Sequence, residues 1–163
     1  MSDGALQHVK LSGPADYTAA LDTICGLAKH NLLIFEKDFL NIGFDSEARF
    51  ELLRNFLLAN PNNRLQLLAH DTRPMSQYCP RLMNLLRQFG HSMFIYQTPK
   101  HLQHLTEPFA VADESQFVRR FHFDHAHGIL GRNDAENARL YKSRFNEMWQ
   151  ASHPSSFTST FSL

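Results

Sequence analysis

The stretch from Asn31 to Ala69, NLLIFEKDFLNIGFDSEARFELLRNFLLANPNNRLQLLA, decides the fold. It begins with a short, continuous apolar run, which is typical of a strand buried on both faces. Ser46 is then a good helix N-cap, and apolar residues recur at intervals of three and four until Pro61 stops the pattern. A second strand-like run starts at Arg64. The stretch therefore predicts two parallel strands joined by a crossover helix.

The same alternation of helix and strand continues on both sides of this unit. Towards the C-terminus it changes to two strand-like runs separated by a short turn, as in a hairpin. The elements expected outside the unit are a helix over 15–30, a helix from Pro80 to Gly90, a strand over 91–97, hairpin strands over 109–112 and 117–123, and a final helix from Asn133. The whole pattern predicts an α/β fold with a mixed, mostly parallel sheet.

Length and composition favour a single globular domain. The chain has 163 residues, of which 43% are hydrophobic and 20% charged, and this is enough for one buried core. We expect the domain to cover residues 15–151. Residues 1–14 are expected to form a flexible leader, and the Ser/Thr-rich residues 152–163 a disordered tail.

The charge balance and the apolar runs exclude some classes of partner. Sixteen Lys and Arg residues cancel sixteen Asp and Glu residues, so no overall field attracts nucleic acid. No apolar run approaches the roughly 20 residues that cross a bilayer, and the first ten residues lack the pattern of a signal peptide. We expect a cytoplasmic protein that binds neither nucleic acid nor membrane, with Cys25 and Cys79 as free thiols.

Three segments resemble a known family. They are the strand from Glu107 to Asp113, the segment GRNDAENARLYKSRFNEMW at 131–149 and the helix from Leu82 to Phe89. Together with the order of the elements, they resemble a bacterial family of degenerate phospholipase D-like domains of unknown function, over roughly residues 17–151. The resemblance implies a phospholipase D-like three-layer sandwich.

The resemblance also bears on catalysis. Active phospholipase D-like enzymes carry His-x-Lys and, after four more residues, Asp: the His attacks phosphorus, the Lys neutralises phosphate oxygens and the Asp orients the machinery. In the register that the resemblance implies, Asp113 is this Asp, whereas Thr106 replaces the His and Pro108 replaces the Lys. A threonine without a nearby base is a poor nucleophile, and proline has no charge. We therefore assign no catalytic residue.

One His-x-Lys tripeptide does occur, at His8, Val9 and Lys10. The next acid is Asp16, one residue too far, and the tripeptide lies in the expected leader before the first helix. A nucleophile needs a rigid support to hold its geometry. We interpret this tripeptide as accidental.

The densest group of possible metal ligands is His122, Asp124, His125 and His127. On an extended strand, alternation sends the first two to one face and the last two to the other. Only a turn near His125 would bring three ligands together. We expect no metal and no other cofactor, and keep a zinc site as the alternative.

The best binding candidates are His70, Asp71 and Arg73, because they directly follow a predicted parallel strand. In open α/β sheets, ligands collect beyond the carboxyl ends of the strands. His101 and His104 would line the same side if the segment 98–106 folds over the sheet edge. Against this, residues 71–74 also have the composition of a solvated turn.

We interpret the chain as a non-catalytic phospholipase D-like binding or interaction module, with no assigned enzyme activity. Its candidate ligand-binding residues are His70, Asp71, Arg73, His101, His104 and Asp113. The partner would be an unknown small molecule or a protein. Two alternatives are a hydrolase or phosphodiesterase with a His-rich site, and a partner domain for an acetyltransferase-type enzyme, since similar sequences are joined to such domains.

A homodimer is a further expectation, because phospholipase D-like catalytic units pair two domains and this chain has one. The surface for a second copy would be the sheet edge or the final helix, which carries a row of large apolar side chains. These are Tyr141, Phe145, Met148 and Trp149. Such a row is more often core, and the alternative is that it packs against the sheet of the same chain.

Overall fold

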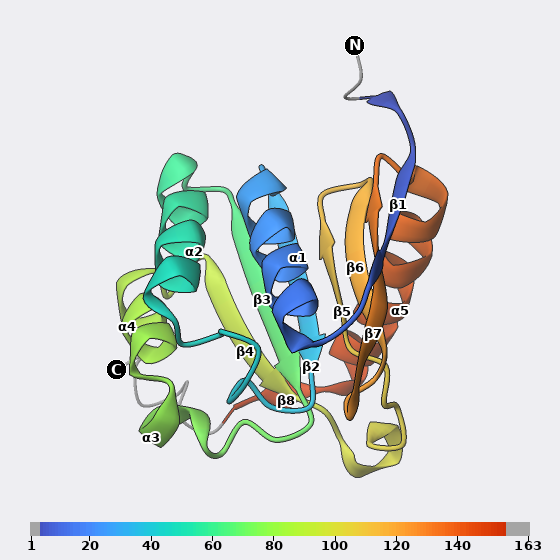
Figure 1. The fold of residues 1–163 in the computed structure, drawn as a ribbon. Helices are drawn as coiled ribbons and strands as arrows, with labels where there is room; N and C mark the ends of the chain where they lie inside the picture. Colours follow the sequence, from blue (N-terminus) through green and yellow to red (C-terminus); the bar gives the residue numbers. More distant parts are fainter. Residues whose placement is uncertain (1–3, 156–163) are drawn as a thin grey trace.

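In the computed structural model, which describes residues 4–155, eight strands form one sheet and helices lie on both of its faces (Figure 1). The strand order is β1-β7-β6-β5-β2-β3-β4-β8. The strands are β1 Gln7–Leu11, β2 Asn31–Glu36, β3 Arg64–Ala69, β4 Met93–Gln97, β5 Phe109–Ala112, β6 Gln116–His122, β7 His125–Arg132 and β8 His153–Pro154. The helices are α1 Pro14–Leu27, α2 Glu47–Ala59, α3 Met75–Tyr78, α4 Pro80–Gln88 and α5 Ala135–Ala151, with a 3-10 turn at Lys100–Leu102.

The sheet is mixed, as the sequence predicts, but the expectation that it is mostly parallel is wrong. Strands β2, β3 and β4 are parallel to one another, whereas every other neighbouring pair is antiparallel. The crossover units stop after β4, and the chain then forms β5, β6 and β7 with short turns. Because a short turn can join only antiparallel strands, this half of the sheet reverses its direction at every step.

The helix starts follow the capping signals in the sequence. Ser46 caps α2, and its hydroxyl oxygen accepts a hydrogen bond from the backbone N–H of Arg49 at 3.1 Å. The cap of α5 is Asp134, one residue beyond the expected Asn133, and its carboxylate accepts from the backbone N–H of Asn137. None of the helices in residues 4–155 has the length and apolar character that crossing a bilayer requires.

Two apolar clusters fill the two faces of the sheet. On one face, α1, α2 and α4 cover residues such as Ile34 and Leu67. On the other face, α5 packs its inner row against Phe35 and Phe109. Tyr141, Phe145 and Met148 are buried in this second cluster, and Trp149 stacks on Tyr96 with ring centroids 4.0 Å apart. The row is therefore core, as one of the two interpretations of the sequence predicts, and it does not form a surface for a second copy.

The N-terminal segment is a correction to the expected flexible leader. Residues 7–11 form β1, which pairs antiparallel with β7 at the edge of the sheet. The Nε2 atom of His8 also lies 2.6 Å from the carboxylate of Asp134, so this tripeptide is held by the domain. Four of the five β1 residues are exposed, and an exposed edge strand has no apolar alternation to reveal it.

Part of the expected disordered tail is ordered as well. His153 and Pro154 form β8 beside β4, and the backbone N–H of Ser155 donates to the carbonyl of Ile95 at 3.1 Å. The remainder of that segment, 156–163, lies outside the described residues.

Strand β7 has no counterpart among the predicted elements, and glycines explain why. Its sequence HAHGILGR contains Gly128 and Gly131, which weaken any strand pattern. A Cβ at Gly131 would collide with the ring of Phe117, and one at Gly128 would collide with the carbonyl of Arg119. Both positions lack a side chain because β6 lies too close.

Candidate functional site

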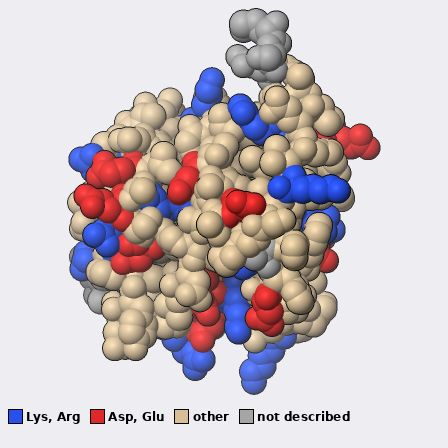
Figure 2. All heavy atoms as spheres, in the orientation of Figure 1, with Lys and Arg blue, Asp and Glu red and all other residues tan. Residues whose placement is uncertain are grey.

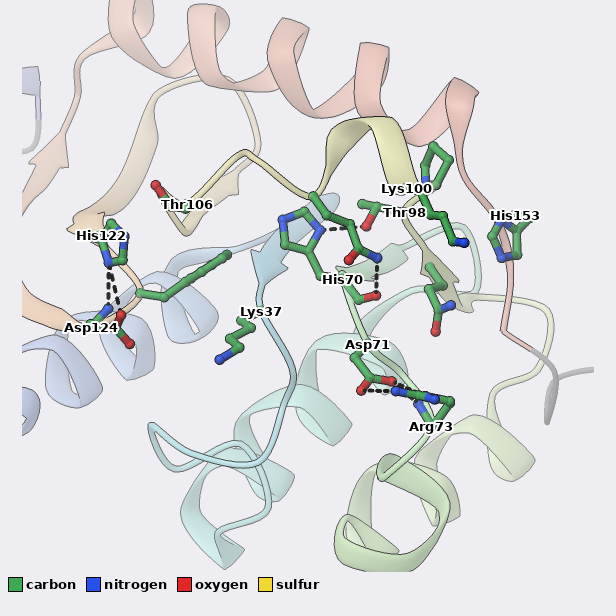
Figure 3. A pocket seen from close by; sticks show the side chains of 14 residues that line it. Lys37, His70, Asp71, Arg73, Thr98, Lys100, Thr106, His122, Asp124 and His153 are labelled. Atoms are coloured by element: carbon green, nitrogen blue, oxygen red, sulfur yellow. Dashed lines mark hydrogen bonds and ion pairs between the residues drawn. The ribbon is translucent and has the colours of Figure 1, made fainter.

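A cavity of about 700 Å³ opens where β2, β3 and β4 end (Figure 3). The carboxyl ends of parallel strands are the usual ligand sites of open α/β sheets. Each strand contributes side chains just beyond its last residue, and the segments that cross this edge supply the others. The lining residues are Lys37, His70, Asp71, Arg73, Gln97, Thr98, Pro99, Lys100, Gln103, Thr106, His122, Phe123, Asp124 and His153.

The His70 side chain is buried at the cavity wall and forms hydrogen bonds with both of its ring nitrogens. Its Nε2 atom lies 2.7 Å from the carbonyl oxygen of Leu105, and its Nδ1 atom 2.6 Å from the hydroxyl of Thr98. A carbonyl only accepts, so Nε2 carries the proton and Nδ1 accepts from the Thr98 hydroxyl. Burial lowers the pKa of His70, which keeps the ring neutral. His70 therefore ties the end of β3 to the crossing segment 98–106.

Asp71 and Arg73 form a pair at the rim. Arg73 donates from Nε at 2.9 Å and from Nη2 at 3.1 Å to the two carboxylate oxygens of Asp71. These bonds lower the pKa of Asp71. The Arg73 side chain is 82% exposed. Much of the hydrogen-bonding capacity of this pair is therefore used internally.

Two lysines supply unpaired positive charge to the cavity. Lys37 directly follows β2, and Lys100 starts the 3-10 turn after β4. Within residues 4–155, neither ammonium group has a hydrogen-bond or ion-pair partner. In Figure 3, Lys37 lies between the His122–Asp124 turn and the side of the cavity formed by His70. The cavity therefore has a free cation on each side of His70.

The other candidates from the sequence lie elsewhere. His104 lines a neighbouring cavity of about 360 Å³ on the α5 side, and His101 is not among the described residues that line either cavity. Asp113 lies at the opposite end of β2. Its carboxylate accepts from three successive backbone N–H groups, those of Lys29, His30 and Asn31, at 2.9, 2.7 and 3.0 Å. Asp113 therefore fixes the start of β2 and does not face the ligand cavity.

The position that the family resemblance gives to the nucleophile does face it. Thr106 lines both the large cavity and its neighbour. Its carbonyl accepts from the N–H of Phe123 at 2.8 Å, and its hydroxyl has no bond to a His, Asp or Glu side chain in the described part of the chain. Pro108 is buried two residues further on. The position of the nucleophile therefore lines the cavity, but the Thr106 hydroxyl has no neighbouring base in residues 4–155 to activate it.

The histidine-rich turn does not gather a metal site. The strand ends at His122 and the next begins at His125, so a turn interrupts the extended stretch that the sequence suggests. The Nδ1 atom of His122 accepts from the N–H of Asp124 at 3.0 Å, and the rings of His122 and His125 have centroids 5.6 Å apart. Among residues 4–155, no three His, Cys, Asp or Glu side chains are placed to hold one ion.

Sequence reasoning missed several of the lining residues. Lys37 had a usable signal, because it follows β2 just as His70 follows β3. Lys100 and Gln103 lie in a segment without periodicity, and the Gln103 side chain donates to the carbonyl of His70 at 3.3 Å. His153 reaches the cavity only because β8 pairs with β4. No local sequence pattern predicts this pairing of β8 with β4.

A protein-family model matches most of the chain. The model described as "Domain of unknown function (DUF7931)" matches residues 13–159. No curated protein matches the sequence.

Several solved structures share the fold. TrmBL2, described as an archaeal chromatin protein with a novel mode of DNA binding, gives a TM-score of 0.66 at 13% identity, over 92% of this chain and 54% of that one. Nuc from Salmonella typhimurium, a phospholipase D family member, gives 0.64 at 12% identity, over 93% and 97%. NucT from Helicobacter pylori gives 0.62 at 11% identity, over 93% and 100%.

These TM-scores establish a common fold, and identities this low carry no statement about activity. The chain spans about half the length of TrmBL2 but nearly all of Nuc and NucT. The expected α/β fold with a mixed sheet is therefore confirmed, and it is similar to the folds of these solved structures.

Proposed function

The chain belongs to the family described as Domain of unknown function (DUF7931), and we propose that it is a non-catalytic, phospholipase D-like domain that binds a small anionic ligand. The ligand would lie in the cavity beyond β2, β3 and β4. In this proposal the three-layer scaffold is retained, the catalytic pair is lost, and the domain works in the bacterial cytoplasm, where the thiols of Cys25 and Cys79 stay reduced.

The observation that carries the proposal is the pair of free ammonium groups of Lys37 and Lys100 in one cavity. Two unpaired cations in a concave site attract an anion, and the concave walls strengthen that attraction. The cavity of about 700 Å³ is within the usual size range for a small-molecule ligand. Phosphate and carboxylate groups both fit these requirements.

The absence of a placed nucleophile supports binding over turnover. The His70 ring has both nitrogens engaged inside the protein, at Thr98 and Leu105, so neither is free to attack a substrate. Thr106 stands where the resemblance expects the nucleophilic His, and Pro108 where it expects the Lys. The motif positions therefore supply neither a nucleophile nor a cation to neutralise the phosphate oxygens.

A small anion fits the surface better than nucleic acid does. Figure 2 shows acidic and basic side chains interspersed over one face, without a continuous basic patch. The whole chain has zero formal net charge. A long polyanion would need an extended row of cations, whereas a single phosphate can be held by one lysine and neutral donors.

Calorimetric titration with ethyl phosphate tests the proposal. We expect binding to the wild-type protein and Lys37→Ala to weaken it about tenfold, since a lost charged contact contributes about 1.4 kcal/mol, with a smaller loss in Lys100→Ala, which lies on the other side of His70. Lys29→Ala is the matched control, because Lys29 is exposed near Asp113 at the other end of β2. Undetectable binding, or equal binding by all four proteins, would refute the proposed function.

A phosphodiesterase is the second candidate, and one observation favours it. His122 and Asp124 line the same cavity as Thr106, and the carboxylate of Asp124 lies 3.6 Å from Nδ1 of His122. Because Nδ1 of His122 accepts from the N–H of Asp124, its Nε2 carries the proton and can serve as a general acid for a leaving group. Phosphodiester turnover that disappears in His122→Ala would favour this candidate over the binding module.

A further inference from the structure

A second, smaller cavity of about 130 Å³ adjoins the large one. The two cavities share Lys37, Phe123 and Asp124, so a ligand held by Lys37 would also border the smaller space. The remaining residues around it are Glu36, Asp38, Asn41, Ile42 and Arg120.

The inner wall of the small cavity is a buried charged group. Arg120 donates from Nη2 to Glu36 at 3.1 Å, and the Tyr17 hydroxyl donates to the other Glu36 oxygen at 3.2 Å. The Arg120 side chain is 8% exposed, and its Nε has no partner. A guanidinium has five N–H donors, and this one uses a single nitrogen within the described residues. Donor capacity therefore remains beside the cavity.

The outer rim offers acceptors. The carboxylate of Asp38 accepts only from the N–H of Leu40 at 3.2 Å, and that of Asp124 contacts no Lys or Arg in residues 4–155. The side-chain amide of Asn41 has no hydrogen-bond partner there, and it can both donate and accept. Ile42 and Phe123 supply the apolar part of the lining.

This mixture of groups discriminates between ligands. An anion would be repelled by Asp38 and Asp124, and a cation by Lys37 and Arg120. A hydroxyl group is neutral and both donates and accepts, so it matches the acids and the bases together. At about 30 Å³ for a water-sized group, the cavity holds about four heavy atoms.

We propose that the small cavity binds a short polyol segment of the same ligand whose anionic group lies beside Lys37 in the large cavity. The ligand class is thus a phosphorylated or carboxylated polyol of three or four carbons. This inference rests on the proposed function, because it assumes an anionic ligand in the large cavity.

Three phosphate esters of similar size separate the possibilities in calorimetric titrations. Ethyl phosphate has no hydroxyl on its chain, glycerol 3-phosphate has two, and 2-aminoethyl phosphate has an ammonium group. We expect glycerol 3-phosphate to bind about tenfold more tightly than ethyl phosphate, as one or two added hydrogen bonds to charged groups allow. We expect 2-aminoethyl phosphate to bind no more tightly than ethyl phosphate.

Two variants test whether the gain comes from the small cavity. Asn41→Ala and Asp38→Asn should each reduce the tenfold preference towards one. Asn41→Ala should leave the affinity for ethyl phosphate unchanged, whereas Asp38→Asn should raise the affinity for both esters, because it removes a negative charge from the cavity that Lys37 also lines. Asp38→Asn keeps an oxygen for the N–H of Leu40, so the turn stays intact. Asn62→Ala is the matched control, because Asn62 is exposed on the α2–β3 connection and only its backbone N–H is bonded.

The outcomes are distinguishable. If ethyl phosphate binds and glycerol 3-phosphate binds no more tightly, the polyol inference is overturned and the proposed function stands. If 2-aminoethyl phosphate binds most tightly, the small cavity selects a cation and the inference is also overturned. If none of the three esters binds, both proposals are overturned.

Discussion

Glu36 and Arg120 form an ion pair inside the domain, with Oε1 and Nη2 3.1 Å apart and side chains 4% and 8% exposed. Burial raises the pKa of Glu36 to about 7, although the nearby Arg120 charge and the Tyr17 hydrogen bond act in the opposite direction. The pair joins the end of β2 to β6, across the intervening β5. Its charge state therefore affects the stability of the sheet where the two cavities meet.

We expect the free energy of unfolding to contain a pH-dependent contribution from Glu36. Between its ordinary value of 4.5 and about 7, the folded protein holds a proton that the unfolded chain releases. The contribution of Glu36 to the free energy of unfolding therefore falls as pH rises through that window, by about 3 kcal/mol in total. Glu36→Gln removes the effect, so urea denaturation from pH 4.5 to 8 should show the wild type losing stability relative to the variant. Parallel pH profiles for the two proteins would contradict the assignment.

We expect no turnover of bis(p-nitrophenyl) phosphate, because Thr106 and Pro108 replace the nucleophile and the phosphate-binding cation of the family motif. The measurement is release of p-nitrophenol by the purified chain over hours. His8→Ala and Lys10→Ala are informative controls, since they remove the one His-x-Lys in the sequence. Turnover by the wild type that is lost in either variant would contradict this prediction.

Asp113→Ala should destabilise the domain by about 3 kcal/mol, because three backbone N–H groups lose their charged acceptor. Asp113→Asn should lose less, since an amide oxygen still accepts and asparagine tolerates the positive φ of 56° at this position. Urea denaturation measures both. Glu114→Ala is the matched control, because its carboxylate is 66% exposed and bonds only Lys142. Equal effects at the two positions would show that the Asp113 contacts contribute little.

The purified protein should carry well under one zinc ion per chain. The turn at residues 123–124 pairs His122 with His125, but no third ligand converges on them within residues 4–155. Elemental analysis after purification without added metal gives the content directly. About one zinc per chain that disappears in His125→Ala would contradict the prediction and favour the hydrolase alternative.

Local patterns in the sequence predicted much of the crossover half of the fold. The strand Arg64–Ala69 and the helix capped by Ser46 have the expected bounds, because apolar periodicity and caps are encoded within a few neighbouring residues. Because ligands bind beyond the carboxyl ends of parallel strands, the sequence also predicted that His70 and Asp71 lie at this edge of the sheet, where both line the cavity. Each of these predictions depends only on short-range chemistry.

Pairing between distant segments was decided by the tertiary structure alone. Strand β1 is exposed and β7 is interrupted by glycines, so neither has a local signature, and each is stabilised by hydrogen bonds to the other across more than a hundred residues. The antiparallel half of the sheet follows from these contacts. A pattern within one segment carries no information about its partner.

The sequence by itself determined that the chain forms an α/β domain and that His70 lies at a strand end, since periodicity and strand order are local properties. Only the tertiary structure decided that Lys37, Lys100 and His153 share one cavity, and that Asp113 bonds backbone N–H groups at the opposite end of β2. The physical reason is that a binding site depends on distances between side chains. Those distances are set by the packing and pairing of the whole sheet.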